Sequence, residues 1–370
     1  MSYVQVLQEI EARGLSIAAA GADLRLQGPR ERKDTDLIRL VKANKVDLLA
    51  HLGASGGFAL TELQRSYLVG RGDGFDIGNV ASHVYHEIHG AWDIDRLETA
   101  LQSVIARHGM LRTRFTADGR QIEEARADLR IARLDLRGQT ETAQRDRLMV
   151  LREQRSHRIL PADRAPLLAA EVTILADNRM VLHVSHDGLV MDAISMFLFF
   201  QAWWSAYGHH DDTGSEPEAS FEAYVAALEH ARGGAPAQRS RKYWLERLDN
   251  LASHPDLPLA TSPSTITSPR FSSHFARLDH VSWAALKTRA AQAGLTPSGL
   301  LFTAYAETLA RWGAGSCFTI NTTVANRPPI HPRILQAIGN FGQTMLVEVT
   351  LDRRLSFADR ARALQAQLRR

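Results

Sequence analysis

The stretch HVSHDGLVMD, residues 183–192, can be interpreted as an active site in two registers. Read from His183 it is H-x-x-x-D-G, in which the histidine would be the general base of an acyl transfer. Read from Asp187 it is D-x-x-x-x-D, an acidic pattern that ends at Asp192 and contains no histidine. The two registers predict different chemistry, and the choice between them depends on the rest of the chain.

A metal site is not predicted here, although His183, His186 and Asp187 lie close together in the sequence. Side chains alternate along a strand, so His183 and His186 should point to opposite faces and cannot easily share one ion. The histidine-rich and acidic residues 209–212 are interpreted as a polar surface loop. Ser185 lacks the G-x-S-x-G turn of a nucleophilic serine, and no glycine-rich phosphate loop follows a strand.

The composition is that of an ordinary globular protein. The chain has 370 residues, of which 45% are hydrophobic and 23% charged, and this length suggests two or three domains. A net charge of +3 without a long basic run does not suggest a nucleic-acid partner. The single cysteine, Cys317, excludes disulfides within the chain and is typical of a reducing cytoplasm.

The most apolar stretch, MFLFFQAWWSAY at 196–207, is too short to span a bilayer, and the N-terminus does not resemble a signal peptide. A helix that is apolar all round is better explained as buried. We therefore expect a cytoplasmic protein with no membrane partner, in which the helix that begins at Ala193 lies in the core.

Strands and helices alternate from residue 58 onward, which predicts an α/β (α+β) fold. Periodicity predicts a helix over Asp93–His108, with Leu97, Leu101, Val104 and Ile105 facing the core. It also predicts strands over Ala169–Leu175 and Met180–His186, joined by the turn ADNR. Residues 253–269, rich in Pro, Ser and Thr, are a plausible crossing between two lobes. Further helices are predicted over Phe221–Arg232, Arg239–Leu248, Trp283–Ala293 and Pro297–Trp312, and strands over Phe318–Val324 and Thr344–Thr350.

Residues 1–52 form a separate small unit with an αββαα pattern, followed by the flexible linker GASGG at 53–57. The strand candidates are Leu15–Ala18 and Leu24–Gln27, and Asp34 is expected to cap the helix that follows. A last short helix is predicted over Lys45–Leu52. A unit this small would gain from pairing with a partner or with itself. Its basic cluster consists of Arg25, Arg30, Arg32 and Lys33 and is either a partner surface or a solvated loop.

Six ordered motifs between residues 58 and 350 decide the register, because they resemble the heterocyclization domains of nonribosomal peptide synthetases. The opening LTELQRSYLVGR at 60–71 is similar to that family's L-T-x-x-Q-x-A-Y-x-x-G-R, with Ser66 in place of alanine. The other five are RHGMLRTRF (107–115), LASHPDLPL (251–259), TPSGLLFTAYAETLARW (296–312), FTINTTVANR (318–327) and IGNFGQTMLVEV (338–349).

The resemblance selects the acidic register. In this family the second aspartate is followed by a small polar residue and a buried helix, as Asp192 is followed by Ser195. Condensation domains, the parent family, have an H-H-x-x-x-D-G motif at this point, and their two histidines would fall on Asp187 and Gly188. The match that begins at His183 is therefore interpreted as accidental, with His183 a polar residue lining the same channel.

The resemblance implies a chloramphenicol-acetyltransferase-like lobe with part of a second such lobe. The expected division is a lobe over 58–250 and an incomplete one over 251–370. Residues 1–52 resemble, in pattern only, the N-terminal αββαα docking domains that precede such modules. Their expected partners are the C-terminal docking peptide of an upstream synthase, together with an acyl carrier protein and a downstream peptidyl carrier protein, and a homodimer of the docking domain is possible.

The reaction implied is condensation followed by cyclodehydration. The amine of carrier-bound Cys, Ser or Thr attacks an upstream acyl thioester, the side-chain SH or OH attacks the new amide, and loss of water leaves a thiazoline or oxazoline. Substrates arrive on phosphopantetheine arms in a tunnel, so no cofactor is expected to be bound by this chain itself. Positioning alone can supply much of the rate of thioester aminolysis.

Asp187 and Asp192 are the catalytic candidates, although structural roles are favoured for both. Asp192 begins a helix, where a carboxylate satisfies backbone N–H groups, and it could pair with Arg327 across the lobes. Accordingly, Asp192→Asn should reduce stability, whereas His183→Ala should be nearly silent. The supporting candidates, taken from the motifs, are Arg327, Asn321, Tyr67, Arg71 and His157.

Two departures from the family leave alternatives open. The family's G-D-F-T is replaced by Gly339-Asn340-Phe341-Gly342, which leans toward ordinary condensation domains. The family's later P-V-V-F-T-S and Q-T-P-Q motifs are not present before Arg370, so residues 1–370 are expected to bind a carrier but not to form thiazoline by themselves. The alternatives are an ordinary condensation domain that forms only an amide, or an inactive carrier- or docking-partner binding module.

Overall fold

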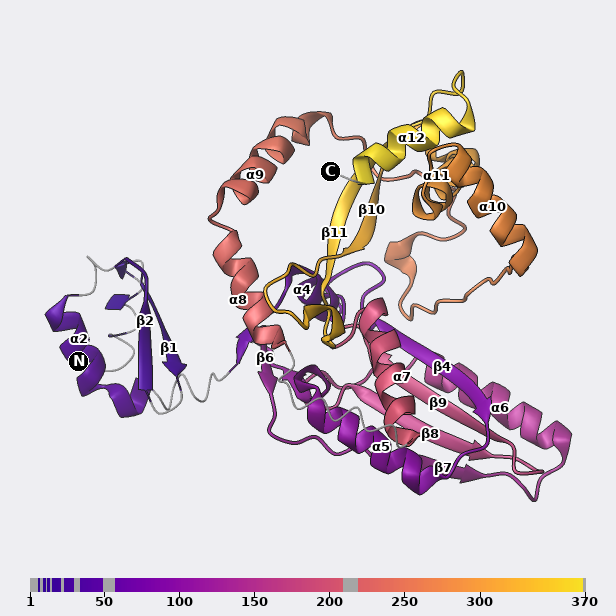
Figure 1. The fold of residues 1–370 in the computed structure, drawn as a ribbon, viewed down its shortest axis with the longest axis horizontal. Helices are drawn as coiled ribbons and strands as arrows, with labels where there is room; N and C mark the ends of the chain where they lie inside the picture. Colours follow the sequence, from indigo (N-terminus) through magenta and orange to yellow (C-terminus); the bar gives the residue numbers. More distant parts are fainter. Residues whose placement is uncertain are drawn as a thin grey trace. The chain divides into compact units, whose positions relative to one another are not determined.

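The structure is a computed structural model that describes residues 6, 9–10, 12–13, 15–20, 23–29, 34–48, 57–208 and 219–368. The chain divides into two compact units (Figure 1). One comprises Met1–Ala59 with Arg120–Ile122, and the other comprises Leu60–Gly119 with Glu123–Arg370. Each unit is described by itself below.

The first unit contains the hairpin and the capped helix that the sequence predicts. Strands β1 (Ser16–Ala20) and β2 (Asp23–Gln27) pair antiparallel, and α2 (Thr35–Ala43) begins where Asp34 Oδ1 accepts a hydrogen bond of 2.8 Å from Leu37 N. Helical residues also occur at 45–48, and the remainder of the last predicted helix lies outside the described residues. The buried core of this unit is Val6, Ile10, Leu15, Leu37, Val41 and Leu48.

Two short strands close to the unit boundary complete the description of this region. Strand β3 (Phe58–Ala59) pairs antiparallel with the start of β6 (Arg120–Glu123), with Phe58 opposite Gln121. Of the predicted linker at 53–57, residues 53–56 lie outside the described part of the chain.

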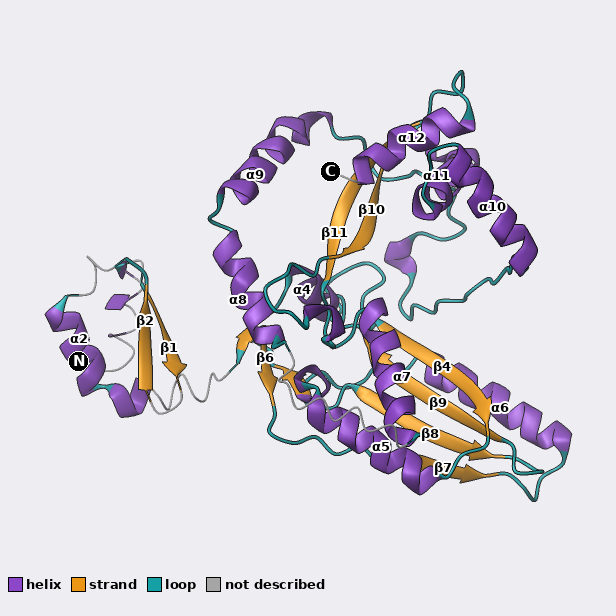
Figure 2. Ribbon diagram, in the orientation of Figure 1, coloured by secondary structure: helices purple, strands orange, loops and turns teal. Residues whose placement is uncertain are grey.

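The second unit is built on a four-stranded sheet in the order β4-β9-β8-β7 (Figure 2). These strands are β4 (His83–Gly90), β9 (Met180–Asp187), β8 (Leu168–Ile174) and β7 (Ala132–Asp135). Only β7 and β8 are parallel, and the other neighbours are antiparallel. The predicted turn between β8 and β9 holds Asp177 and Asn178 at φ of 56° and 58°, a conformation that Asp and Asn tolerate better than most residues.

Helices cover both faces of this sheet. On one face lie α5 (Ile94–Arg107) and α7 (Ala193–Tyr207), and on the other lies α6 (Glu141–Ser156) (Figure 1). The main core forms between the sheet and the first two helices, from Leu97, Leu101, Val104 and Ile105 of α5 with Leu182 and Val184 of β9. The four core positions predicted for α5 are therefore confirmed.

Helix α7 is less buried than its composition predicts. Ser195, Phe199 and Trp203, spaced four residues apart, are fully enclosed, whereas Phe197 is 69% exposed. The prediction of a helix buried on all sides is wrong because only the side that faces the sheet and α5 is covered. No helix among the described residues is long and apolar enough to cross a membrane.

The rest of the second unit forms a smaller core around a two-stranded sheet. Strands β10 (Cys317–Ala325) and β11 (Gly342–Thr350) pair antiparallel. Their residues Phe318, Ile320, Val347 and Val349 pack against α11 (Pro297–Leu309) and α12 (Phe357–Leu368). The remaining elements are α4 (Glu62–Val69), β5 (Thr113–Phe115), α8 (Phe221–Ala231), α9 (Ala235–Arg247) and α10 (His280–Gln292). Residues 251–262 and 266–279 lie outside helices and strands, and the crossing between two lobes expected over 253–269 stays a prediction.

Candidate functional site

Asp187 is the last residue of β9, and its side chain is completely buried. Its Oδ1 accepts a hydrogen bond of 2.9 Å from Leu189 N, and Arg71 Nη2 forms an ion pair with its Oδ2. Arg71 Nη1 donates to Leu160 O at 2.8 Å, which fixes the guanidinium. Burial raises the pKa of Asp187, and the charge of Arg71 opposes that shift.

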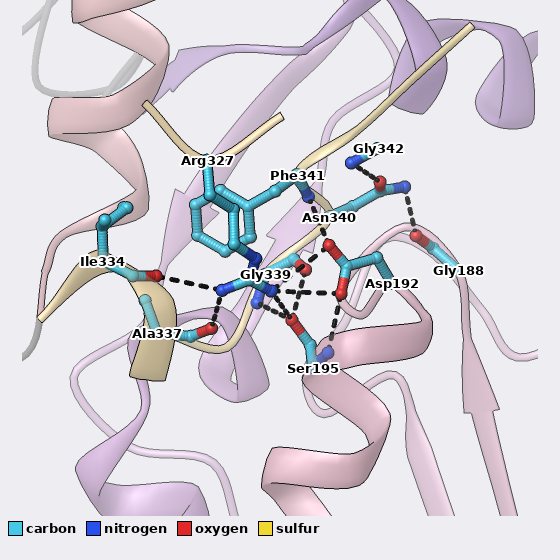
Figure 3. A network of polar contacts seen from close by, with 10 residues as sticks. All are labelled: Gly188, Asp192, Ser195, Arg327, Ile334, Ala337, Gly339, Asn340, Phe341 and Gly342. Atoms are coloured by element: carbon cyan, nitrogen blue, oxygen red, sulfur yellow. Dashed lines mark hydrogen bonds and ion pairs between the residues drawn. The ribbon is translucent and has the colours of Figure 1, made fainter. Parts of the chain in front are cut away.

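Asp192 begins α7 and connects it to a distant part of the chain (Figure 3). Its Oδ1 accepts from Ser195 N at 2.7 Å, as expected of a helix-capping carboxylate. Its Oδ2 accepts from Phe341 N at 3.1 Å. The ion pair expected from the sequence is present, with Arg327 Nη2 at 3.2 Å from Oδ1 and 3.3 Å from Oδ2.

Arg327 is held on several sides, and only 4% of its side chain is exposed. Its Nη1 donates to the carbonyl oxygens of Ile334 and Ala337 at 3.0 and 2.8 Å, and its Cζ lies 4.0 Å from the centre of the Phe341 ring. A buried charge needs a counter-ion and hydrogen bonds, and Asp192 and these carbonyls supply them to Nη1 and Nη2. Among the described residues, Nε has no hydrogen-bond partner.

Ser195 completes this network as both donor and acceptor (Figure 3). Its Oγ donates to Gly339 O at 2.7 Å and accepts from Arg327 Nη2 at 2.8 Å and from Gly339 N at 3.0 Å. The start of α7 is thereby tied to the segment after β10 and to the loop before β11. The two aspartates have different partners, which agrees with structural roles for both.

His183 is buried, and its interpretation as a polar residue that lines the channel stays a prediction. It points toward the α6 face of the sheet, where its Nδ1 lies 2.6 Å from Tyr85 Oη and its Nε2 lies 2.9 Å from Thr173 Oγ1. Only 4% of the residue is exposed, and burial lowers its pKa. The alternation of the strand places Val181, His183, Ser185 and Asp187 on this side, so His183 fills the space between the sheet and α6.

His186 faces the other side of the sheet, as the alternation predicts. Its Nε2 lies 3.3 Å from His86 Nε2, and the two rings stack. Burial lowers the pKa of His186 to about 3 and that of His83 to about 4. Among the described residues, no group of three His, Cys, Asp or Glu side chains could hold a metal ion.

Among the described residues, the other candidates from the sequence form no hydrogen bond or ion pair with Asp187 or Asp192. His157 ends α6, where its Nδ1 lies 3.2 Å from Ser156 Oγ and 3.1 Å from Glu153 O. Asn321 is exposed on β10 opposite Leu346, and Tyr67 is half-buried on α4. These positions show that a motif residue need not contact the centre of the site.

The basic cluster of the first unit is only partly described. Arg25 lies on β2 with its backbone opposite Ala18, whereas Arg30, Arg32 and Lys33 lie outside the described residues. Its role as a partner surface therefore stays a prediction.

Two buried amides close to the aspartates were missed as functional residues. Gln64 Nε2 donates to Leu189 O at 2.8 Å, and Asn340 Nδ2 donates to Gly188 O at 2.6 Å. Both belong to motifs that the sequence shows, LTELQ and GNFG. The motifs include Gln64 and Asn340, but the sequence does not indicate their hydrogen-bond partners, because these are set by tertiary contacts.

The comparisons with known proteins define the class. The model of the condensation domain family matches residues 56–370, and the chain belongs to that family. Two crystal forms of the EpoB NRPS cyclization-docking bidomain from Sorangium cellulosum cover 99% of this chain, with TM-scores of 0.77 and 0.78 at 34% and 33% identity. The chain covers 76% and 77% of those structures.

Curated relatives point to the same type of domain. Pyochelin synthetase PchF of Pseudomonas aeruginosa (strain UCBPP-PA14) is 34% identical over an alignment of 384 positions, which covers all of this chain and 21% of that protein. Phenyloxazoline synthase MbtB of Mycobacterium bovis is 32% identical over 321 residues, or 84% of this chain and 22% of that protein. The chain thus spans about a fifth of the length of these relatives, and the expected fold and family are confirmed.

Proposed function

We propose that this chain contributes a heterocyclization domain, preceded by a docking domain, to a nonribosomal peptide synthetase. The amine nitrogen of a carrier-bound Cys, Ser or Thr attacks the upstream thioester carbonyl, and the phosphopantetheine thiol leaves with a proton. The side-chain sulfur or oxygen then adds to the new amide carbon. The amide oxygen takes the hydrogen of the SH or OH group and leaves as water together with the amide N–H hydrogen, which gives the C=N bond of a thiazoline or oxazoline.

The observation that carries this proposal is the acidic register at the junction of β9 and α7. A condensation domain with a histidine base would have its histidines on positions 187 and 188, and this chain has Asp187 and Gly188 there. Asp187 and Asp192 are each paired with an arginine, which favours a role in holding the site. Two relatives are named for cyclization and for phenyloxazoline synthesis, which supports the same chemistry.

The expected partners follow from this reaction. Both substrates would arrive on the phosphopantetheine arms of carrier proteins, one upstream and one downstream, and the chain itself would hold no cofactor. The orientation of amine and thioester can supply a large part of the rate, because fixing two reactants in contact removes the entropy cost of a bimolecular step. An upstream synthase would contact the docking domain through its C-terminal peptide.

The alternative is a condensation domain that stops at the amide. The sequence Gly339-Asn340-Phe341-Gly342, in which an acid and a hydroxyl of the heterocyclization motif are replaced, favours it. The two candidates differ by one molecule of water in the product on the downstream carrier.

Intact-mass measurement of the downstream carrier distinguishes them when the protein assayed also contains the later P-V-V-F-T-S and Q-T-P-Q motifs, without which no thiazoline is expected. Both carriers are loaded, and the acceptor carries Cys in one reaction and Ala, which has no nucleophilic side chain, in the other. Heterocyclization gives the amide with Ala and the amide minus one water with Cys. An amide without water loss from Cys would support the alternative, and no amide with either acceptor would contradict both and leave a binding module.

A further inference from the structure

The chain between Asp187 and Asp192 is a short turn whose first two carbonyl groups are held by buried amides. Asn340 Nδ2 donates to Gly188 O at 2.6 Å, and Gln64 Nε2 donates to Leu189 O at 2.8 Å (Figure 3 shows the former). Asn340 is 1% exposed and Gln64 is fully buried. The donors come from the loop before β11 and from α4, so three distant segments meet at consecutive peptide groups.

The orientation of each amide is set by its oxygen. Asn340 Oδ1 accepts from Gly342 N at 3.1 Å, and Gln64 Oε1 accepts from Thr61 N at 3.0 Å in the capping box of α4. Because backbone N–H groups only donate, the side-chain oxygens must face them. The NH₂ groups therefore point at Gly188 O and Leu189 O, which only accept.

Close packing leaves the backbone of the Gly188–Leu189 turn no room to shift toward other hydrogen-bond partners. A Cβ atom added at Gly188 would lie 2.5 Å from Ser82 Oγ, and one at Gly342 would lie 2.8 Å from Leu63 Cδ2. One at Gly339 would lie 2.5 Å from the ring of Phe221. A close-packed interior transmits the loss of a contact as a shift of the backbone.

We infer that Asn340 and Gln64 are positioning residues whose amide donors hold the Gly188–Leu189 turn and thereby set the geometry between Asp187 and Asp192. This inference rests on the proposed function for its effect on turnover. A carboxylate at either place could keep the hydrogen bond to Gly342 N or Thr61 N but would present a second acceptor to a carbonyl oxygen. Only its protonated form could donate.

The test compares Asn340→Asp, Gln64→Glu and Asn340→Ala in the complete chain. Condensation rates are measured at saturating substrate relative to the unmodified protein at pH 6 and pH 8. Burial raises the pKa of the carboxyl group that the two acidic variants introduce, so the group is protonated at the lower pH and can again donate to the carbonyl oxygen of the turn. For both acidic variants we expect a loss on the order of tenfold at pH 8 that is largely recovered at pH 6, as the loss of one buried hydrogen bond predicts. Asn340→Ala should be impaired equally at both pH values.

Gln144→Glu is the matched control. Gln144 is a buried amide whose Nε2 donates to Leu136 O and Gln139 O, both at 3.0 Å and away from the turn. This variant also loses a buried donor, but its rate relative to the unmodified protein should not depend on pH. A pH-dependent loss of the same size in Gln144→Glu, or none in Asn340→Asp and Gln64→Glu, would overturn the inference.

Hydrogen exchange tests the same inference without turnover, so a protein that forms no amide still gives a result. Leu189 N, Val190 N and Asp192 N are bonded to Asp187 Oδ1, Asp187 O and Gly339 O. After correction for intrinsic rates, these amides should lose protection in Asn340→Asp and Gln64→Glu at pH 8 and regain it at pH 6. Protection unchanged from the unmodified protein would contradict the positioning role, whatever the activity.

Discussion

Asp192 and Arg327, which are 135 positions apart, form an ion pair that connects the start of α7 to the segment after β10. Their side chains are 13% and 4% exposed, so the pair lies largely out of water. The same carboxylate caps α7 and accepts from Phe341 N. Asp192 therefore caps α7, accepts a hydrogen bond from the loop before β11 and is the counter-ion of the buried Arg327 guanidinium.

Asp192→Asn should lower the free energy of unfolding by about 3 kcal/mol, because Arg327 would be left buried without a counter-ion. Asparagine still caps a helix well, so the loss would report the charge and not the cap. Chemical denaturation of both proteins measures it. Asp352→Asn, which breaks an exposed pair with Arg354, is the control and should have a much smaller effect. Equal effects of the two substitutions would contradict the importance of burial.

His183→Ala should destabilise the protein without stopping condensation. Removal of the ring leaves the hydroxyl groups of Tyr85 and Thr173 without this partner, at a cost of about 1–3 kcal/mol. This replaces the expectation from the sequence that the substitution would be nearly silent. The thermal midpoint and the condensation rate per folded molecule are the two measurements. A folded variant with no condensation would restore the histidine-base register.

Lowering the pH should destabilise the protein through its buried histidines. In the unfolded chain a histidine titrates at about 6.5, whereas burial lowers the pKa of His186 to about 3 and that of His83 to about 4. The unfolded state therefore takes up protons first as the pH falls. The contribution of the buried neutral histidines to the free energy of unfolding is fully present above about pH 6.5 and is lost as the pH falls toward 4.

His186→Gln should reduce the slope of the free energy of unfolding against pH by about 1.4 kcal/mol per pH unit between about pH 4 and 6.5. The ring of His86 stacks on His186, and the electrostatic influence of His83 also lowers the pKa of His186. Unfolding curves between pH 4 and 7 measure the slope, and His230→Gln, at an exposed position of α8, is the control. A slope that is the same in His186→Gln and the unmodified protein would show that His186 does not contribute.

Local patterns predicted the elements that depend on sequence neighbours. The caps Asp34 and Asp192, and the four core positions of α5, could be named because capping and helical spacing depend on residues a few positions away. Strand β4 was missed, since His83, His86 and His89 interrupt the apolar alternation that indicates a strand.

Tertiary partners were harder to predict than elements. The Asp192–Arg327 pair could be proposed, because a charge at a buried helix start requires a counter-ion. The roles of Gln64 and Asn340 could not, because an amide can satisfy its hydrogen bonds locally or across the fold. The exposure of Phe197 was also beyond reach, since a helix that is apolar on all sides gives no indication of which side is covered.

The last prediction concerns the first unit, which we propose to be a docking domain, and its hairpin of β1 and β2. A partner peptide could lie along a strand edge, with the basic cluster of Arg25, Arg30, Arg32 and Lys33 facing acidic residues of an upstream synthase. Exposed ion pairs are individually weak, but several together set partner choice in a salt-dependent way. We expect roughly micromolar binding of an upstream C-terminal peptide, weaker at high salt.

Charge reversal at Arg25 and Arg30 to Glu should weaken this binding without unfolding the unit. Arg39→Glu is the matched control, because Arg39 is exposed on α2 of the same unit and lies outside the basic cluster. Labelled peptide is titrated into the complete chain at low and high salt, and circular dichroism checks the fold of each variant. If neither salt nor the double reversal changes the affinity, the basic cluster is a solvated loop, because electrostatic docking requires that both weaken the complex.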